Sequence, residues 1–282
     1  MTTFDTPDPI SVQLDFGASV ANVRLVATDR ADTIVEVTPS DPSRSLDVKA
    51  AAKTEITLTG RNLLVLGSRQ ANWFGTDGSV DLTIELPNDS KVVADSAHGG
   101  FHTEGRLGEC RFTTYYGNLD LDHTGPLQAR TGGGKLTVDH VDGDAEVTSS
   151  IGTVRVGFVD GDARVQSDHG TATVAEVTGA LRVTASGEIT VDRAQADVVA
   201  KSNLGDIRIG EVSSGSITME TADGELEVGV SDGVAVWFDA ATNVGTVNNA
   251  LTVMDGPEES EATVEIRART HRGDILIRRV DV

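Results

Sequence analysis

The sequence predicts an all-β protein: a parallel β-solenoid, of the β-helix or β-roll kind, with an N-terminal β cap. Two phrases of five residues return at near-constant spacing over residues 99–230, half a period apart. Each coil, or rung, therefore holds two short strands in about 18 residues. Apolar and polar residues alternate within both phrases, which indicates strands with one buried and one exposed face. When each strand stacks on the matching strand of the next rung, two parallel sheets form and face each other across a thin core. Connections between parallel strands are nearly always right-handed, so right-handed coiling is expected.

The first phrase consists of a glycine followed by two apolar residues, at the third and fifth positions. Its copies begin at Gly117, Gly134, Gly152, Gly170, Gly187, Gly205 and Gly224. The second phrase begins at Gly125, Gly143, Gly161, Gly179 and Gly215, and Ala196 stands where one further glycine is expected. A repeated turn often needs positive φ, which glycine adopts without steric cost. The first apolar position predicts an inward column of Leu136, Val154, Ala172, Ile189, Ile207 and Leu226.

Residues 1–90 lack this period and are interpreted as a mostly antiparallel β cap that protects the open edge of the first rung. A frayed start is expected over residues 1–9, and no amphipathic helix is expected. The strands expected in the cap are Ile10–Phe16, Val20–Ala27, Thr33–Thr38, Leu46–Ala50, Glu55–Leu58, Leu63–Leu66 and Val80–Leu86. Regular rungs follow over 91–230. Residues 231–282 continue the solenoid as C-terminal rungs, with strands at Val234–Phe238, Thr246–Leu251, Ala262–Ala268 and Asp274–Arg278.

The charge and the termini narrow the function classes. The net charge is −21 with acidic residues spread over the whole chain, which argues against binding to nucleic acid or to anionic lipid. No stretch is apolar enough to span a bilayer, and residues 1–10 carry no basic apolar signal segment. The single cysteine excludes an intramolecular disulfide. A cytoplasmic location is therefore expected.

Several phrases outside the rungs carry a family resemblance. They are Glu36–Pro42, Ile84–Pro87, Gly245–Asn249, Arg267–Thr270 and Gly273–Arg278, in this order around the glycine-led repeats. With them, nearly the whole chain resembles a bacterial family of β-strand repeats of unknown function that is catalogued as candidate adhesins. The resemblance implies a β-solenoid and no established catalytic residues, so it supplies no site residues or cofactor. The adhesin label implies an exported protein.

Two histidines are the weak metal candidates of this sequence. His123 and His140 occupy the same place in successive rungs, beside Asp122 and Asp139, and such a set could hold zinc or another divalent ion. The favoured interpretation is a tolerant turn position, because later rungs place Phe158, Glu176, Arg193 and Glu211 there. On that interpretation no metal is bound and chelators leave the melting temperature unchanged.

Other reactive groups are expected to be structural. Cys110 takes an inward position and is expected to be an inert core residue. The stacked phrases 142–144 and 160–162, both Asp-Gly-Asp, could attract calcium, but Asp-Gly is a common tight-turn pair. The C-terminal arginines, among them Arg267 and Arg269, are expected to cover acidic neighbours in the same molecule. The alternative is a basic terminus that meets an acidic partner or a second copy.

The expected function is a non-enzymatic β-solenoid that acts as a rigid, adhesin-like interaction or scaffold surface for a protein partner or for a second copy. No catalytic residue and no cofactor is expected, because outward positions carry mixed side chains and aromatic residues make up only 4%. One alternative is a carbohydrate-active parallel β-helix enzyme, a lyase or hydrolase, which would need a cleft with convergent charged groups. Another is a self-assembling solenoid polymer that stacks end to end.

Overall fold

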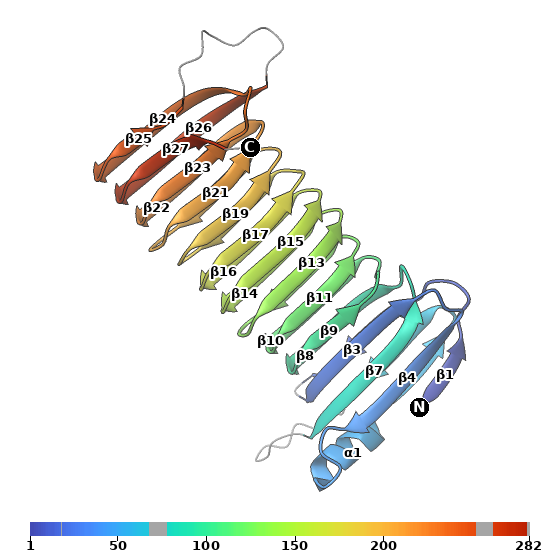
Figure 1. The fold of residues 1–282 in the computed structure, drawn as a ribbon. Helices are drawn as coiled ribbons and strands as arrows, with labels where there is room; N and C mark the ends of the chain where they lie inside the picture. The colour runs from blue at the N-terminus through green and yellow to red at the C-terminus, as the bar shows by residue number, and fades with distance from the viewer. Residues whose placement is uncertain (18, 68–77, 252–261, 281–282) are drawn as a thin grey trace. The chain divides into compact units, whose positions relative to one another are not determined.

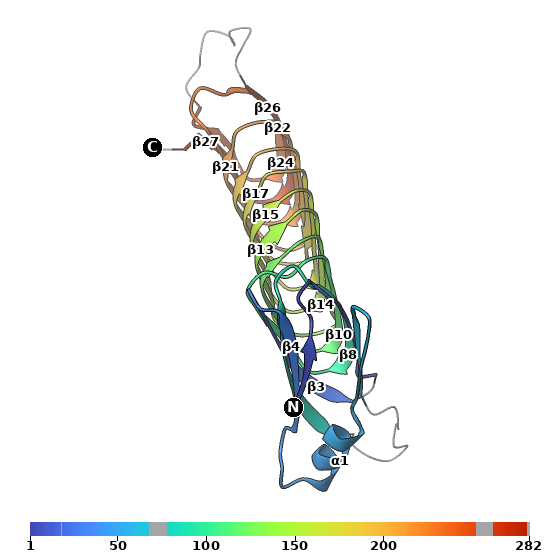
Figure 2. The ribbon, with the colours of Figure 1, turned by 90° about the vertical axis from the view of Figure 1, so that its right-hand side faces the viewer.

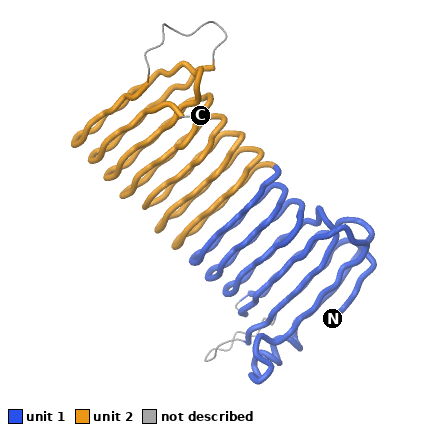
Figure 3. Tube along the Cα trace, in the orientation of Figure 1, with its two compact units in different colours: residues 1–142 blue, residues 143–282 orange. Residues whose placement is uncertain are grey.

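A computed structural model describes residues 1–17, 19–67, 78–251 and 262–280, which form 27 β-strands and one α-helix (Figure 1). The predicted all-β parallel solenoid is confirmed. The chain divides into two compact units, residues 1–142 and 143–282, and within each unit the strands form facing rows joined by turns (Figures 2 and 3). The division falls inside the stretch predicted as regular rungs. The predicted right-handed coiling stays a prediction.

Unit 1 contains thirteen strands and the helix. They are β1 (Thr2–Asp5), β2 (Ser11–Asp15), β3 (Val20–Thr28), β4 (Asp32–Pro39), α1 (Ser45–Lys53), β5 (Glu55–Thr59), β6 (Asn62–Leu66), β7 (Ser79–Pro87), β8 (Lys91–His98), β9 (Phe101–Glu104), β10 (Cys110–Tyr116), β11 (Leu119–Thr124), β12 (Leu127–Thr131) and β13 (Leu136–Asp142). One row pairs in the order β5, β6, β2, β8, β10, β12. The other pairs in the order β1, β4, β7, β3, β9, β11, β13.

The predicted antiparallel cap needs three corrections. Only the pairs β1–β4, β4–β7 and β5–β6 are antiparallel, whereas β2 and β3 run parallel to their neighbours on both sides. The strands β2 and β3 therefore form a true rung, inserted between β6/β7 and β8/β9. The expected frayed start contains β1, which hydrogen-bonds along β4. Strand alternation alone does not say on which side a segment finds its partner, so the sequence left this arrangement open.

The expected strand Leu46–Ala50 is instead part of α1, which packs against β4 and β7 (Figures 1 and 2). Three consecutive alanines at 50–52 favour a helix, because alanine has the highest helix propensity. The fully buried Asp47 fixes the helix in place, since its carboxylate accepts the backbone N–H groups of Asp41 at 3.2 Å and Ser79 at 3.0 Å. The helix therefore covers part of β4 and β7.

Unit 2 is a fully parallel stack. Its strands are β14 (Ala145–Ile151), β15 (Val154–Asp160), β16 (Ala163–His169), β17 (Ala172–Val177), β18 (Leu181–Ala185), β19 (Ile189–Ala194), β20 (Val198–Ser202), β21 (Ile207–Val212), β22 (Gly215–Asp223), β23 (Leu226–Val230), β24 (Ala235–Val244), β25 (Val247–Asn249), β26 (Thr263–Arg272) and β27 (Ile275–Arg279). The last two strands, β26 and β27, lie between β22/β23 and β24/β25. In each unit, then, a segment near a chain end is inserted between two other pairs of strands.

The predicted inward column is confirmed within each unit. In unit 1, Leu119 pairs with Leu136. In unit 2, the register joins Val154, Ala172, Ile189, Ile207 and Leu226 in a single line. All these side chains are buried. Each rung alone could not bury them, so neighbouring rungs stabilise one another through this column.

Each unit also contains buried hydroxyl side chains that sequence reasoning did not identify. Each hydroxyl donates a hydrogen bond of 2.8–3.1 Å to the carbonyl of a turn glycine one rung away. The donors are Thr114, Thr131, Ser167, Ser202, Thr221 and Thr270. The turns approach so closely that a Cβ added at Gly170 would lie 1.8 Å from the carbonyl oxygen of Gly152. The repeated glycines are therefore required by the close stacking of backbones as well as by turn conformation.

Candidate functional site

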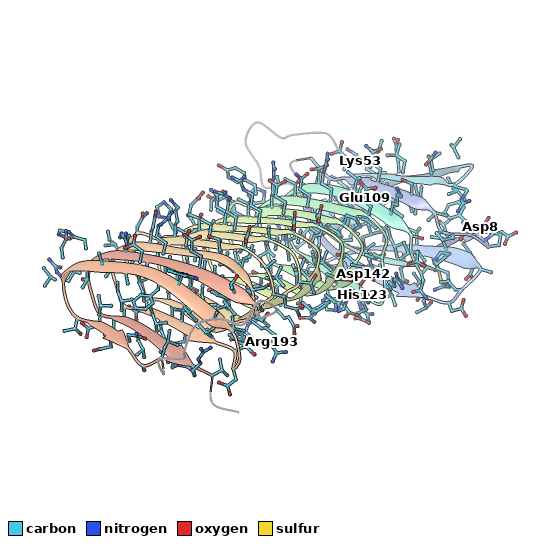
Figure 4. All side chains as sticks on the ribbon, turned by 90° about the horizontal axis from the view of Figure 1, so that it is seen from above. Asp8, Lys53, Glu109, His123, Asp142 and Arg193 are labelled. Atoms are coloured by element: carbon cyan, nitrogen blue, oxygen red, sulfur yellow. The ribbon has the colours of Figure 1, made fainter. Side chains whose placement is uncertain are left out.

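The predicted histidine pair is brought together on the outside of unit 1. His123 in β11 lies opposite His140 in β13, and the centroids of their rings are 4.3 Å apart. The Nε2 atom of His123 is 2.9 Å from Oδ2 of Asp142, and Nε2 of His140 is 3.0 Å from Oδ1 of the same carboxylate. Figure 4 shows the labelled His123 and Asp142 side by side on the outer side of the ribbon. Two imidazoles thus converge on one carboxylate.

The carboxylates that sequence spacing placed beside these histidines do not join them. Asp122 accepts the backbone N–H of Gly105 at 2.7 Å, so its carboxylate is held by the neighbouring turn. Asp139 precedes His140, but the group of convergent donor atoms in the described ranges contains only His123, His140 and Asp142. Residues two apart on a strand share a face, so Asp142 accompanies His140. That rule could have identified Asp142, which sequence reasoning considered only for calcium.

Two hydrogen-bonding imidazoles and one cation, Arg106, shape the electrostatics of Asp142. Hydrogen bonding from His123, then from His140, holds the pKa of the Asp142 carboxyl below its ordinary value, and the charge of Arg106 acts in the same direction. The guanidinium of Arg106 has Nη2 3.1 Å from Oδ2 of Asp142 and Nε 3.2 Å from Oδ1 of Asp89. Asp142 therefore stays an anion down to low pH, and Arg106 is shared between two carboxylates.

Two of the calcium candidates, Asp144 and Asp162, are part of a structural ladder, whereas Asp142 belongs to the histidine cluster. In unit 2, Oδ1 of Asp144 accepts the backbone N–H of Asp162 at 3.0 Å, and Oδ1 of Asp162 accepts that of Ala180 at 2.8 Å. The same bond to a backbone N–H of a neighbouring rung recurs at Asp197, Asp206 and Asp274. These carboxylates therefore stabilise the turns.

Cys110 is an inert thiol. Its side chain is buried, and the residue pairs with Val92 on one side and Leu127 on the other. Burial raises the pKa of the Cys110 thiol to about 12. A thiol that is not ionised at neutral pH is neither a nucleophile nor a metal ligand, so the expected core role is supported.

The family model Toastrack DUF4097 matches residues 12–281, nearly the whole chain. The chain belongs to the Toastrack DUF4097 family. This is a family of unknown function. No curated protein matches the sequence.

Solved structures similar to this Toastrack chain share little sequence with it. A candidate adhesin from Parabacteroides distasonis is 14% identical, with 98% of this chain and 95% of that chain covered and a TM-score of 0.38. A candidate adhesin from Parabacteroides merdae is 10% identical, with coverages of 97% and 94% and a TM-score of 0.35. A candidate lipid-binding protein from Parabacteroides distasonis is 12% identical, with coverages of 97% and 95% and a TM-score of 0.32.

The C-terminal arginines of the Toastrack chain have partners inside unit 2. Arg269 pairs with Asp239, Arg272 with Asp223 at 2.8 Å, and Arg278 with Glu227 at 2.8 Å. Arg267 lies 3.4 Å from Glu265, and Arg279 donates to the carbonyls of Ser231 and Val234. The expectation that C-terminal arginines cover acidic neighbours of the same molecule is confirmed for Arg267, Arg269, Arg272 and Arg278.

A small aromatic patch lies exposed at the end of β10. The rings of Tyr115 and Tyr116 meet edge to face at 5.0 Å, and His98 stacks on Tyr116 at 5.9 Å. Tyr115 is 65% exposed and Tyr116 is 52% exposed. We call His98, Tyr115 and Tyr116 the tyrosine patch. The two consecutive tyrosines could have predicted this patch from the sequence, because neighbouring residues on a strand point to opposite faces and so cannot both point into a thin core.

In the part of the chain that the structure describes, the helix is too short to cross a membrane. Two depressions on the sheet faces are shallow and open. One lies in unit 1 over β3, β7, β9 and β11, and the other in unit 2 over β20, β22, β24 and β26. Their charged side chains are tied in pairs such as Arg24–Glu104 at 2.8 Å and Lys201–Glu220 at 2.6 Å.

Proposed function

We propose that the chain acts as a non-enzymatic, rigid interaction scaffold, adhesin-like in that it works through its surface, with the tyrosine patch as a contact point for a protein partner. The observation that carries this proposal is how the polar groups of the rungs are used. Turn aspartates bind backbone N–H groups of neighbouring rungs, and buried hydroxyls bind glycine carbonyls. These groups hold the fold together and are not free for chemistry.

The tyrosine patch fits a protein contact on physical grounds. Tyrosine supplies a large apolar surface and a polar tip at a low cost in side-chain entropy, and such residues dominate binding energy at protein interfaces. The rings already hold one another in place, so binding needs little further ordering. The patch stands on a parallel stack whose rungs support each other, which makes the scaffold beneath it rigid.

The proposal is tested by capturing partners from an extract with three immobilised proteins: the parent, a Tyr115→Ala, Tyr116→Ala variant, and a Leu204→Ala control. Leu204 is an apolar residue that is 71% exposed in a turn of unit 2. We expect one partner to be retained by the parent and the control, and to bind the double variant at least about 30-fold more weakly, the effect of losing a hot spot of about 2 kcal/mol. Equal capture by all three proteins would disprove the role of the patch.

The enzyme alternative gives a different result in a simple assay. A polysaccharide lyase or hydrolase would release unsaturated or reducing sugar ends from a panel of polysaccharides. We expect no release by the parent chain above that of a heat-denatured sample. Turnover that is abolished when a single exposed carboxylate is neutralised would overturn the non-enzymatic proposal.

Self-association is a second candidate, and the last rung of unit 2 favours it. Among the described strands, β24 and β25 each pair on one side only, and their rung exposes Trp237, Phe238 and Val247. A sheet edge with exposed apolar side chains is a template for pairing with another chain. Light scattering decides between the two: a concentration-dependent dimer that Trp237→Asp converts to monomer would support self-association, and a monomer at all concentrations would exclude it.

A further inference from the structure

The cluster of His123, His140 and Asp142 has the form of an open metal site. Its donor atoms, one from each residue, all lie within 4.8 Å of one another. The three side chains are between 29% and 38% exposed, so one side of the cluster is open to water. Two imidazoles and one carboxylate with open positions form a common set of ligands for divalent transition metals.

The fold itself produces this convergence. Parallel strands lie about 4.8 Å apart, so a residue repeated at one position of successive rungs stacks directly on its copy. His123 and His140 are paired in this way, and both direct Nε2 to Asp142. Donor atoms around a tetrahedral zinc ion with bonds of about 2.0–2.1 Å lie roughly 3.3 Å apart. The observed separations, 2.9 Å to Oδ2 and 3.0 Å to Oδ1 of Asp142, each need to widen by only a few tenths of an ångström when both carboxylate oxygens face the ion.

We propose that His123, His140 and Asp142 bind one divalent transition-metal ion, with Zn²⁺ as the probe ion. Nε2 of each histidine and the carboxylate of Asp142, through one or both of its oxygens, are the protein ligands, and water completes the coordination shell. The ion replaces the hydrogen bonds between the imidazoles and the carboxylate, and any proton held in them leaves to solvent. Hard ions such as Mg²⁺ prefer oxygen ligands and are not expected at a site with two nitrogen donors.

Arg106 acts as a built-in competitor for this ion. Its guanidinium occupies Oδ2 of Asp142, and a cation bound at the cluster would repel it. The same guanidinium already touches Asp89, so it can keep one carboxylate partner when the ion takes Asp142. Removing the positive charge with Arg106→Gln should therefore strengthen metal binding, whereas a purely structural role for Arg106 predicts no such gain.

A second histidine of unit 1 supplies a matched control. His102 also lies between two carboxylates, with Nδ1 3.2 Å from Asp120 and Nε2 3.0 Å from Glu104. These carboxylates meet different nitrogens, which point in different directions from the ring, so one ion cannot be bound by all three groups. The His102→Gln variant removes an exposed histidine from the same unit without touching the proposed site.

The experiment is a calorimetric titration of the metal-free chain with Zn²⁺, with Mg²⁺ as the negative ion, and a thermal melt of each sample. We expect one Zn²⁺ per chain and a higher melting temperature in its presence, because a ligand of the folded state stabilises it. His123→Gln, His140→Gln and Asp142→Asn should each weaken binding by more than about 100-fold, above the loss usual for groups that only orient a ligand. Arg106→Gln should strengthen it several-fold, and His102→Gln should leave it unchanged.

Thermal melts without metal show whether each variant is folded. All five substituted side chains are partly exposed, so the variants are expected to fold and a loss of zinc binding can be assigned to the site. Equal zinc affinity in the parent and in both histidine variants would overturn the proposal. So would an equal loss in His102→Gln, which would indicate weak binding to any surface histidine. A chelator that leaves the melting temperature of the zinc-treated parent unchanged would likewise contradict a site that binds only the folded state.

Discussion

The outward position held by His123 and His140 in unit 1 has a counterpart in unit 2, and the two differ sharply. In unit 2 the position carries Glu176, Arg193 and Glu211 on successive rungs. Arg193 lies 3.0 Å from Glu211 and 3.9 Å from Glu176, so opposite charges alternate along the stack. In unit 1 the same position places two imidazoles on one shared carboxylate. The first arrangement neutralises itself, whereas the second leaves converging donor atoms open to water.

The comparison teaches that the solenoid separates fold from function by the direction of the side chain. Inward positions of both units hold buried aliphatic residues in register. Outward positions change from rung to rung without altering that register. A change inside should therefore cost far more stability than a change outside, whereas a change outside should alter only what the surface binds.

The largest effect is expected inside the column. Ile189→Asp would bury a lone carboxylate between Ala172 and Ile207 and should lower the free energy of unfolding by about 4 kcal/mol or more. Chemical denaturation measures this change. Thr173→Asp is the outward control, because Thr173 lies half-buried on the outward face beside Arg155, and the substitution should change stability by less than about 0.5 kcal/mol. Similar losses in both variants would remove the distinction between the two faces.

The buried thiol tests the interior of unit 1. With a pKa raised from 9.0 to about 12, native Cys110 should react with a thiol reagent about 1000-fold more slowly than the unfolded chain, for lack of thiolate. Below pH 9 the thiol keeps its proton in both states. Between pH 9 and pH 12 it ionises only in the unfolded state, so the free energy of unfolding should fall with rising pH. In the Cys110→Ala variant the free energy of unfolding should not show this fall between pH 9 and pH 12. Rapid reaction of the native protein with the thiol reagent would show that Cys110 is exposed, which would contradict the account.

The glycine turns should show a moderate effect. Gly170→Ala would drive a methyl group against the carbonyl of Gly152, and backbone on both sides must shift. We expect a loss of about 1–3 kcal/mol, typical of overpacking. Gly133→Ala is the matched control, since its methyl group would meet only the side chain of Tyr116, at 3.1 Å. Thermal unfolding of both variants measures the two losses of stability. If Gly170→Ala melted at the temperature of the parent, the turns would be less closely stacked than the structure shows.

The smallest effect is expected in the charge ladder of unit 2. Arg193→Met removes the cation between two glutamates but keeps most of the apolar stem. Because the Arg193 side chain is 55% exposed, the loss should be under about 1 kcal/mol and should shrink in high salt. Denaturation at two salt concentrations measures it. A large, salt-independent loss would mean that outward positions also hold the fold.

The interior of the protein was predictable from the sequence because it is set by two periods, the alternation along a strand and the return of each rung. Residues such as Ile189 and Ile207 show both periods, because each is an apolar position of an alternating strand and they occupy the same place in successive rungs. The helix α1 was missed although alanines 50–52 signalled it, since the neighbouring β pattern was given more weight. The insertion of β2/β3 and of β26/β27 between other strands was not predictable, because the residues of a strand do not determine which strands lie on either side of it.

The candidate site was predictable only in part. Stacking of His123 on His140 follows from their spacing, and the pair was found. The third member, Asp142, follows from the rule that residues two apart on a strand share a face. The sequence pattern favours Asp122 and Asp139 instead, because they directly precede the two histidines in the sequence. Asp122 is excluded by its bond to the N–H of Gly105, a contact that spacing does not reveal. The competing Arg106 comes from a loop outside the repeated phrases and lies opposite His123 through a single bridge.

The central claim, that outward side chains alone decide what a rung binds, is tested most directly by moving the unit 1 cluster into unit 2. Glu176→His and Arg193→His reproduce the stacked pair, and Gln195→Asp supplies the carboxylate two residues on. The background carries His123→Gln and His140→Gln, so that the original site is absent. Equilibrium dialysis should then find one Zn²⁺ per chain, against none in the background protein. A folded variant that still binds no zinc would contradict the claim.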